Sequence, residues 1–310
     1  MTSDNRYPLR LLETWRSLFY TPIYASLAGG FLEREGLDVE FSTCPLQFAH
    51  PLTALNRDAG DIAQSGIMRS IIASDWGAET VPVHFAKINS RDGFFLLSST
   101  PQEQFRWDSL RGAKVVPVGF SPTPWASLQS ALRKHGVDPA GLELLTGLSL
   151  SEAVAAFKEG QAEFVHVAEP TAEELLAQGA GHMAVELGPE NGHIAYSSFA
   201  ATNRYLEAHP ETVFRFTTGF ARTLRWLQES TPEEIGGAVT EFFPETAPEL
   251  VVASIARYKS QDTWPRDPVL NQPEYESLHD ILSDAGLCLD RQPYSKVVRT
   301  DIAESALASL

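Results

Sequence analysis

Cysteine, long apolar runs and positive charge are all scarce in this chain of 310 residues. The two cysteines, Cys44 and Cys288, lie far apart and have no metal-ligand or redox spacing, so we expect ordinary reduced thiols. No stretch approaches the about 18 consecutive apolar residues of a transmembrane helix, so we expect no membrane span. The 24 basic residues against 40 acidic ones give a net charge of −16, which disfavours nucleic acid and anionic lipid as partners.

Several chemical motifs are absent as well. The eight histidines form no short metal-ligand spacing, and no phosphate-binding glycine loop or nucleophile elbow occurs. We therefore expect neither a metal nor a cofactor. The first residues also lack the apolar segment and cleavage site of a signal peptide. If Met1 is the native start, a cytoplasmic protein is expected; if a signal peptide has been removed, a periplasmic or cell-surface one.

What the chain does contain is a regular alternation of strand-like and helix-like segments. Its hydrophobic content of 43% is enough for a folded core, and the alternation predicts an α/β fold with parallel sheets covered by helices. From residue 207 onward the pattern is almost wholly helical, and its aromatic residues are expected to be core.

One local unit occurs twice: an apolar strand, a polar turn ending in Thr-Pro, and a helix. The first copy contains Thr21-Pro22 and the second Thr123-Pro124. We expect each threonine to cap its helix, with the following proline in the first turn. Free N–H groups at such a helix start favour an anion. Two copies about 100 residues apart predict two lobes facing a shared cleft.

The chain has no linker-like stretch between these units. Two crossover strands, near residues 91–95 and 196–202, are therefore expected to join the lobes. The predicted first lobe is discontinuous, residues 1–93 plus 200–310 with the C-terminal helices, and the second lobe, residues 94–199, is inserted into it.

At this point the sequence resembles a known family. The segments around Pro22–Ala25, Gly30–Leu32 and Glu35–Glu40, together with Gly60-Asp61-Ile62 and Glu169-Pro170, are similar to the solute-binding proteins of the alkanesulfonate-binding and thiamine-pyrimidine-synthase-like superfamily. The resemblance covers about residues 9–230. It implies a two-lobed type II periplasmic-binding-protein fold that closes on a small ligand, and an ABC permease as a possible partner.

The same superfamily contains enzymes, to which this chain is only partly similar. Its segments near Arg57 and Arg91 resemble the aromatic sulfinate desulfinase, but the desulfinase nucleophilic cysteine falls at Ser17 and its catalytic histidine at Gln47. The pyrimidine synthase has a cysteine-rich crossover strand and a Lys/His pair, whereas this chain has residues 195–199 without cysteine, and Ser65 with Arg69.

Residues at strand ends and helix starts are the candidates for the cleft. Arginines there would meet a charge, hydroxyls would donate hydrogen bonds, and aromatic rings would form walls. The predicted ligand-binding residues are Trp15, Arg16, Ser17, Tyr20, Thr21, Ser65, Gly66, Arg69, Ser121, Thr123, Trp125, His166, Glu169 and Tyr196. Each has an ordinary structural alternative, either core packing or a surface salt bridge, and Cys44 is a weaker candidate.

Two functional hypotheses follow. The first is a ligand-trapping protein for a small, flat organic anion, such as an aromatic carboxylate, a sulfonate or a pyrimidine-like compound. The second is a cytoplasmic lyase, decarboxylase or desulfinase-like enzyme on the same scaffold. Its acid–base groups would be His166 or His193 with Arg69, and possibly Lys87. A sensor or partner-binding module is a third class that leaves no mark on the sequence. Convergence of these side chains in one pocket would discriminate between the first two.

Overall fold

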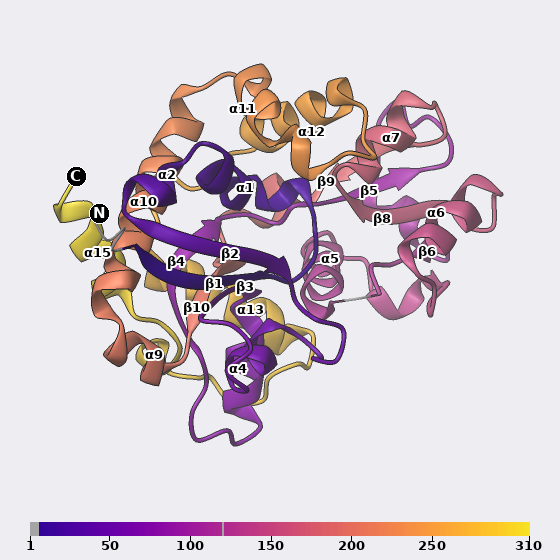
Figure 1. Ribbon diagram of the computed structural model, residues 1–310. Helices are drawn as coiled ribbons and strands as arrows, with labels where there is room; N and C mark the ends of the chain where they lie inside the picture. The colour runs from indigo at the N-terminus through magenta and orange to yellow at the C-terminus, as the bar shows by residue number, and fades with distance from the viewer. Residues whose placement is uncertain (1–5, 120) are drawn as a thin grey trace.

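The computed structural model describes residues 6–119 and 121–310 and has two α/β lobes, each built on a five-stranded sheet (Figure 1). The strands of the first sheet, in spatial order, are β2 (Leu37–Thr43), β1 (Tyr7–Glu13), β3 (Ile62–Gly66), β10 (Ser197–Ala201) and β4 (Val83–Asn89). Those of the second are β7 (Glu143–Leu144), β6 (Lys114–Val116), β8 (Phe164–Ala168), β5 (Phe94–Ser98) and β9 (His182–Glu186). The predicted two-lobed α/β fold is confirmed.

Each sheet is mixed, with two parallel strand pairs and one strand that runs against both of its neighbours. β10 is antiparallel to both β3 and β4, and β5 is antiparallel to both β8 and β9. The chain passes from the first sheet to the second between β4 and β5, and it returns between β9 and β10. The lobe boundaries at residues 93 and 200 stay a prediction; β10 as a whole belongs to the first sheet.

Helices cover the faces of the sheets. They are α1 (Thr21–Ala28), α2 (Phe31–Arg34), α3 (Pro51–Leu55), α4 (Met68–Asp75), α5 (Pro122–Lys134), α6 (Leu150–Lys158), α7 (Thr171–Ala177), α8 (Leu187–Asn191), α9 (Asn203–Ala208), α10 (Pro210–Glu229), α11 (Pro232–Val239), α12 (Pro248–Ser260), α13 (Gln272–Asp284), α14 (Tyr294–Val297) and α15 (Thr300–Ala308). Short 3-10 turns occur at η1 (Leu18–Tyr20), η2 (Trp107–Leu110), η3 (Pro139–Gly141) and η4 (Thr240–Phe242). Among the described residues, no helix combines the length and apolarity that crossing a membrane would require.

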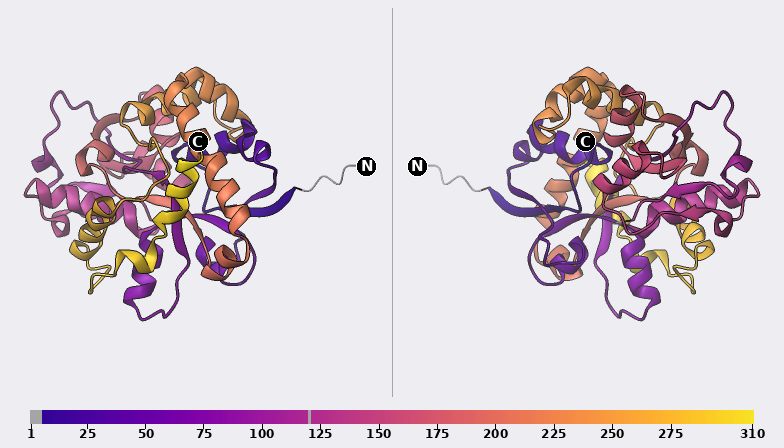
Figure 2. Two further views of the ribbon diagram at one scale, coloured as in Figure 1. Left: turned by 90° about the vertical axis from the view of Figure 1, so that its left-hand side faces the viewer. Right: turned by 90° about the vertical axis from the view of Figure 1, so that its right-hand side faces the viewer.

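The long helix α10 packs its aromatic side on the first sheet. The ring of Phe199 on β10 meets Phe216 and Phe220 at centroid distances of 4.7 and 4.8 Å, and all three side chains are fully buried. Buried aromatic pairs of this kind contribute about 0.5–1.5 kcal/mol beyond area burial. The C-terminal helix α15 lies beside α10 on the outside of this lobe (Figure 2).

The C-terminal helices connect the two lobes. α12 packs against α7 of the second lobe and against η1 of the first, and α13 packs against α5 and α4 in the same way. Gly93, in the connection between β4 and β5, lies where a Cβ atom would be only 2.2 Å from the Phe19 ring, so this close approach requires glycine. The lobes are therefore held together by more than the two crossovers.

Both Thr-Pro units begin helices after strands, as predicted, but neither threonine is a cap. The N-cap of α1 is Tyr20 and that of α5 is Ser121. The Thr21 hydroxyl donates to the Leu18 carbonyl at 2.7 Å, and Thr123 is the second residue of α5. The prediction of threonine caps failed because both helices begin earlier than expected. α1 begins at Thr21, directly after η1, and α5 begins at Pro122.

Candidate functional site

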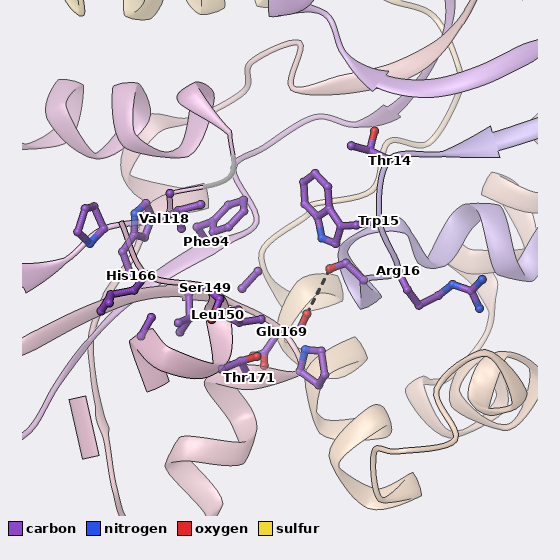
Figure 3. Close-up of a pocket in the computed structure, with 18 of the residues that line it drawn as sticks. Thr14, Trp15, Arg16, Phe94, Val118, Ser149, Leu150, His166, Glu169 and Thr171 are labelled. Carbon is purple, nitrogen blue, oxygen red and sulfur yellow. Dashed lines mark hydrogen bonds between the residues drawn. The ribbon is translucent and has the colours of Figure 1, made fainter. Parts of the chain in front are cut away.

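A cavity of about 410 Å³ lies between the lobes (Figure 3). The first lobe contributes the segment that follows β1, together with Ala49 and Arg69. The second lobe contributes Phe94, the segment that follows β6, the end of β8 with the residues after it, and the start of α6. This volume falls in the range of about 300–1,000 Å³ that is typical of small-molecule sites. The lining residues are Thr14, Trp15, Arg16, Ser17, Ala49, Arg69, Phe94, Pro117, Val118, Gly119, Leu148, Ser149, Leu150, Ala153, His166, Val167, Ala168, Glu169, Pro170 and Thr171.

A second, much smaller cavity of about 20 Å³ adjoins the first, because Thr14, Trp15 and Arg69 line both. Its other lining residues come from η1, the end of β3, the starts of α4 and α5, and the start of β10: Tyr20, Gly66, Met68, Ser121, Thr123, Pro124, Tyr196 and Ser197. The indole of Trp15 packs edge-on against the Tyr20 ring at 5.3 Å. The site thus has a large chamber and a small one, and the small one is bordered by the hydroxyl-bearing residues Tyr20, Thr123 and Tyr196.

Arg69 is the cation common to both chambers. Its side chain is half-buried, and burial lowers the pKa of its guanidinium from the ordinary value. Among residues 6–119 and 121–310, no carboxylate forms an ion pair with it. A half-buried guanidinium without a carboxylate partner is well suited to bind an anionic group.

Two helix starts reinforce this positive end of the site. α4 begins at Met68 and α5 at Pro122, both without a side-chain cap and without an acidic residue in the first turn. The hydroxyls of Thr123 and Tyr196, which line the same small chamber, are buried and have no hydrogen-bond partner in the described part of the chain. Free N–H groups, two spare hydroxyls and one guanidinium suit an oxyanion.

The opposite helix start has a different character. α6 begins beside the large chamber, but its N-cap Ser149 is engaged in a capping box with Glu152: the Ser149 N–H donates to the Glu152 carboxylate at 2.8 Å. That carboxylate already answers the helix dipole, so this end offers little to an anion.

His166, on β8, is part of the large chamber's wall in the second lobe. It is 2% exposed, and its ring packs edge-on against Phe94 at 5.4 Å. Burial lowers the pKa of His166 to about 3, so the imidazole is neutral near pH 7. Figure 3 shows His166 and Trp15 on opposite sides of the chamber.

Glu169 closes the chamber where β8 ends. Its backbone carbonyl accepts a hydrogen bond from the Ser17 hydroxyl of the first lobe at 3.3 Å (Figure 3). Its carboxylate accepts from Arg257 at 2.9 Å and from the Glu173 N–H at 2.8 Å. Burial raises the pKa of Glu169 to about 7, against the opposing effects of these two donors. Glu169 therefore connects the second lobe to the first lobe through its carbonyl and to α12 through its carboxylate.

Arg16 reaches the cavity edge, but its guanidinium is paired elsewhere. The side chain turns away from the chamber (Figure 3), donates to Glu13 at 2.7 Å and lies over the rings of Tyr24, Phe41 and Phe242. Arg16 thus lines the cavity edge while its guanidinium is paired with Glu13, and its charge-meeting role stays a prediction. The buried Glu13 carboxylate, 0% exposed, requires this partner.

Three further predicted residues line neither chamber. Thr21 is fully buried next to η1, Ser65 is buried on β3 beside its β10 partner Ser198, and Trp125 packs against the core from the fourth position of α5. η1 separates α1 from the cavity, so the first Thr-Pro corner does not face the cleft and the second one does. The other predicted residues, Trp15, Ser17, Tyr20, Gly66, Arg69, Ser121, Thr123, His166, Glu169 and Tyr196, line one chamber or both.

The groups expected for acid–base catalysis are not brought together. His193 lies outside both chambers, 3.0 Å from Arg91 and 3.6 Å from Asp262. The ammonium of Lys87 is bound by both oxygens of Glu274, at 2.8 and 3.0 Å. Cys44 also lines neither chamber, and burial raises the pKa of its thiol. Of the predicted set, only His166 and Arg69 share the cavity.

Much of the second lobe's wall was missed by sequence reasoning. Pro117, Val118 and Gly119 follow β6, and Leu148–Leu150 precede and start α6. The rule that selected Trp15, namely that cleft residues follow the carboxyl ends of strands, would have selected the segment after β6 too. Small apolar residues carry no chemical signature, so the sequence alone does not identify them as lining a cleft.

Comparison with known proteins places this architecture. The model of the NMT1/THI5-like family matches residues 19–235. The chain is also 31% identical over 297 residues to the "Putative binding protein YtlA" of Bacillus subtilis (strain 168), covering 96% of this chain and 89% of that protein. The chain belongs to the NMT1/THI5-like family.

Many solved structures share the fold of this NMT1/THI5-like protein, among them two ligand complexes. The alkanesulfonate-binding protein SsuA from Xanthomonas axonopodis pv. citri, bound to MOPS, superposes with a TM-score of 0.73 at 17% identity, over 94% of this chain and 98% of that one. A cysteine-to-serine mutant of DszB in complex with biphenyl-2-sulfinic acid superposes with a TM-score of 0.74 at 14% identity, over 98% and 100%. The predicted resemblance to both kinds of protein is confirmed at the level of the fold.

Proposed function

We propose that this protein traps a small organic anion between its lobes, with the anionic group at Arg69 and the apolar body in the large chamber. Aryl or alkyl sulfonates and carboxylates are the ligand class. The observation that carries the proposal is the half-buried Arg69, which has no acidic partner in the described part of the chain, at the junction of the two chambers. A buried cation gains most from a ligand that supplies the missing charge.

The apolar walls set the rest of the ligand's chemistry. Trp15 and Phe94 offer ring faces and edges, and Val118, Leu148 and Leu150 offer aliphatic surface. A flat or short hydrophobic body fits such a chamber, whereas a bare inorganic anion would leave it empty. The ligands bound to the two fold neighbours, MOPS and biphenyl-2-sulfinic acid, combine an oxyanion with an organic body. They support this class for the present chain.

We further propose that the protein serves as the ligand-binding component of an ABC import system. Ligand would shift an open–closed equilibrium toward the closed form, in which Ser17 touches Glu169 across the lobes. The closed form would then be what a permease recognises. If so, the protein acts outside the cytoplasm, which fractionation of the source cells would test.

Calorimetric titration of arylsulfonates and arylcarboxylates tests the binding proposal. Arg69→Gln should weaken binding at least about 30-fold, because a desolvated charge would lose its partner. Arg69→Lys should fall between, since it keeps the charge but not the forked donor. The exposed Arg106→Gln is the matched control and should bind like the wild type. Equal affinity of Arg69→Gln and the wild type would refute the proposal.

A further inference from the structure

The imidazole of His166 is a buried polar group that the anion site leaves unexplained. Neither ring nitrogen has a hydrogen-bond partner in the described part of the chain, and the side chain belongs to the wall of the large chamber. Its neighbours are Phe94 and the strand residues Val167 and Ala168, whose side chains are apolar. A buried polar group left unsatisfied costs roughly 1–3 kcal/mol, so a bound group that satisfies it gains correspondingly.

The position of His166 defines what that group must be. Arg69 comes from α4 of the first lobe, whereas His166 comes from β8 of the second, and Trp15 lies across the chamber from it (Figure 3). A neutral imidazole has one N–H donor and one acceptor nitrogen. It therefore complements a group that both donates and accepts, and it offers no charge to a second anion.

We propose that the ligand carries, in addition to its oxyanion, a neutral donor–acceptor group that His166 binds at the other end of the apolar body. A hydroxyl or a carboxamide is such a group. This inference rests on the proposed function, because it assumes that the oxyanion is at Arg69. It narrows the ligand from any amphipathic anion to one with two polar ends.

Selectivity for such a ligand follows from the same burial. A site built to hydrogen-bond a hydroxyl or N–H discriminates against the analogue that lacks it, because its own polar atoms are then left unpaired. A purely hydrocarbon body would leave both nitrogens of His166 as they are now. The spare hydroxyls of Thr123 and Tyr196 do not compete for this role, since they line the small chamber with Arg69.

A ligand-pair experiment on two protein variants tests the proposal. The probes are benzenesulfonate and its 3-hydroxy, 4-hydroxy and 4-carbamoyl derivatives, titrated into the wild type, His166→Leu and His166→Gln. At least one substituted compound should bind the wild type about 10-fold or more tightly than the parent, which corresponds to one well-made buried hydrogen bond. His166→Leu should abolish this preference while still binding the parent compound. His166→Gln, which keeps a neutral donor and acceptor, should retain part of it.

The possible outcomes separate the two proposals. A parent compound that binds through Arg69, with no gain from any substituent or with a gain that persists in His166→Leu, overturns the role of His166 and leaves the proposed function standing. Failure of all four compounds to bind overturns both. If the thermal melt shows that His166→Leu does not fold, His166→Asn replaces it. A preference for the substituted compound that is lost in His166→Asn and kept in His166→Gln then supports the proposal. An equal preference in the wild type and both variants contradicts it.

Discussion

Asp92 is a fully buried carboxyl group between β4 and β5. Its Oδ1 atom accepts the Phe94 N–H at 2.8 Å, while Oδ2 has no partner in the described residues. Burial raises the pKa of Asp92 to about 7. The folded state therefore holds a proton that the unfolded state has released between about pH 4 and 7.

Asp92→Asn should change how stability depends on pH. Because the folded pKa of Asp92 is raised, its contribution is fully present below the unfolded pKa and is lost as the pH rises through 7. The wild type thus loses up to about 1.4 kcal/mol per pH unit over this window relative to the variant. Urea unfolding at pH 5, 6, 7 and 8 measures the difference. The exposed Glu79→Gln is the control, and parallel curves for Asp92→Asn and the wild type would speak against the idea.

Residue-scale prediction from sequence succeeded where the local chain decides the outcome and failed where a distant segment does. Arg69 and Arg16 both follow strands in the first lobe, and the sequence gives no means to rank them. The guanidinium of Arg16 is instead held by the Glu13 carboxylate and by the backbone carbonyl and ring of Phe242, a residue more than 200 positions away. Such long-range partners are invisible to spacing arguments.

At the scale of elements, β4 and α13 are joined by a buried ion pair. The Lys87 and Glu274 side chains are 6% and 11% exposed, and the pair is bidentate. Glu274 lies in the first turn of α13, capped by Asn271. The pair fixes α13 to β4, the strand that leads into the second lobe.

Lys87→Met should destabilise the protein by about 3–5 kcal/mol, because it leaves the Glu274 carboxylate buried without a partner. The double variant Lys87→Met/Glu274→Leu should recover most of that loss, since neither charge remains. Chemical unfolding of the wild type, the single variant and the double variant measures both effects. A double variant no more stable than the single one would show that the carboxylate is not the cause.

Elements were predictable to the extent that local pattern sets them. The strand–helix alternation and the presence of a helix at each Thr-Pro corner follow from residue order alone, whereas the exact first residue of each helix does not. η1 did not, because Leu18–Tyr20 is a single 3-10 turn that is stabilised by burial and by the Ser17 hydroxyl accepting the Phe19 N–H. Because η1 lies between β1 and α1, the start of α1 does not line the cavity.

At the scale of the whole molecule, the lobes share more than a hinge. Tyr258 on α12 donates to the Gly93 carbonyl at 2.8 Å and accepts from the Glu169 N–H at 3.1 Å, and Trp264 donates to the Phe19 carbonyl at 3.0 Å. Buried contacts of the C-terminal region therefore connect both sheets. Neither lobe keeps its full set of partners if the other unfolds.

Thermal unfolding should accordingly be one cooperative transition. In differential scanning calorimetry, the calorimetric and van't Hoff enthalpies are expected to agree, and a saturating organic anion should move the single peak upward in temperature. Two resolved peaks, or a ligand shift confined to one of them, would mean that the lobes unfold independently. Exposed Arg106→Gln serves again as the unperturbed reference for the ligand shift.

The strand order of the first sheet has a consequence for synthesis on the ribosome. β10 fills the gap between β3 and β4, yet it is made more than 100 residues after both. Until residue 201 emerges, β3 and β4 each have one edge whose backbone N–H and C=O groups are unpaired and can bind another chain. Premature termination before that point would yield an aggregation-prone, chaperone-dependent fragment. Termination within the later helices would leave the first sheet with all five of its strands.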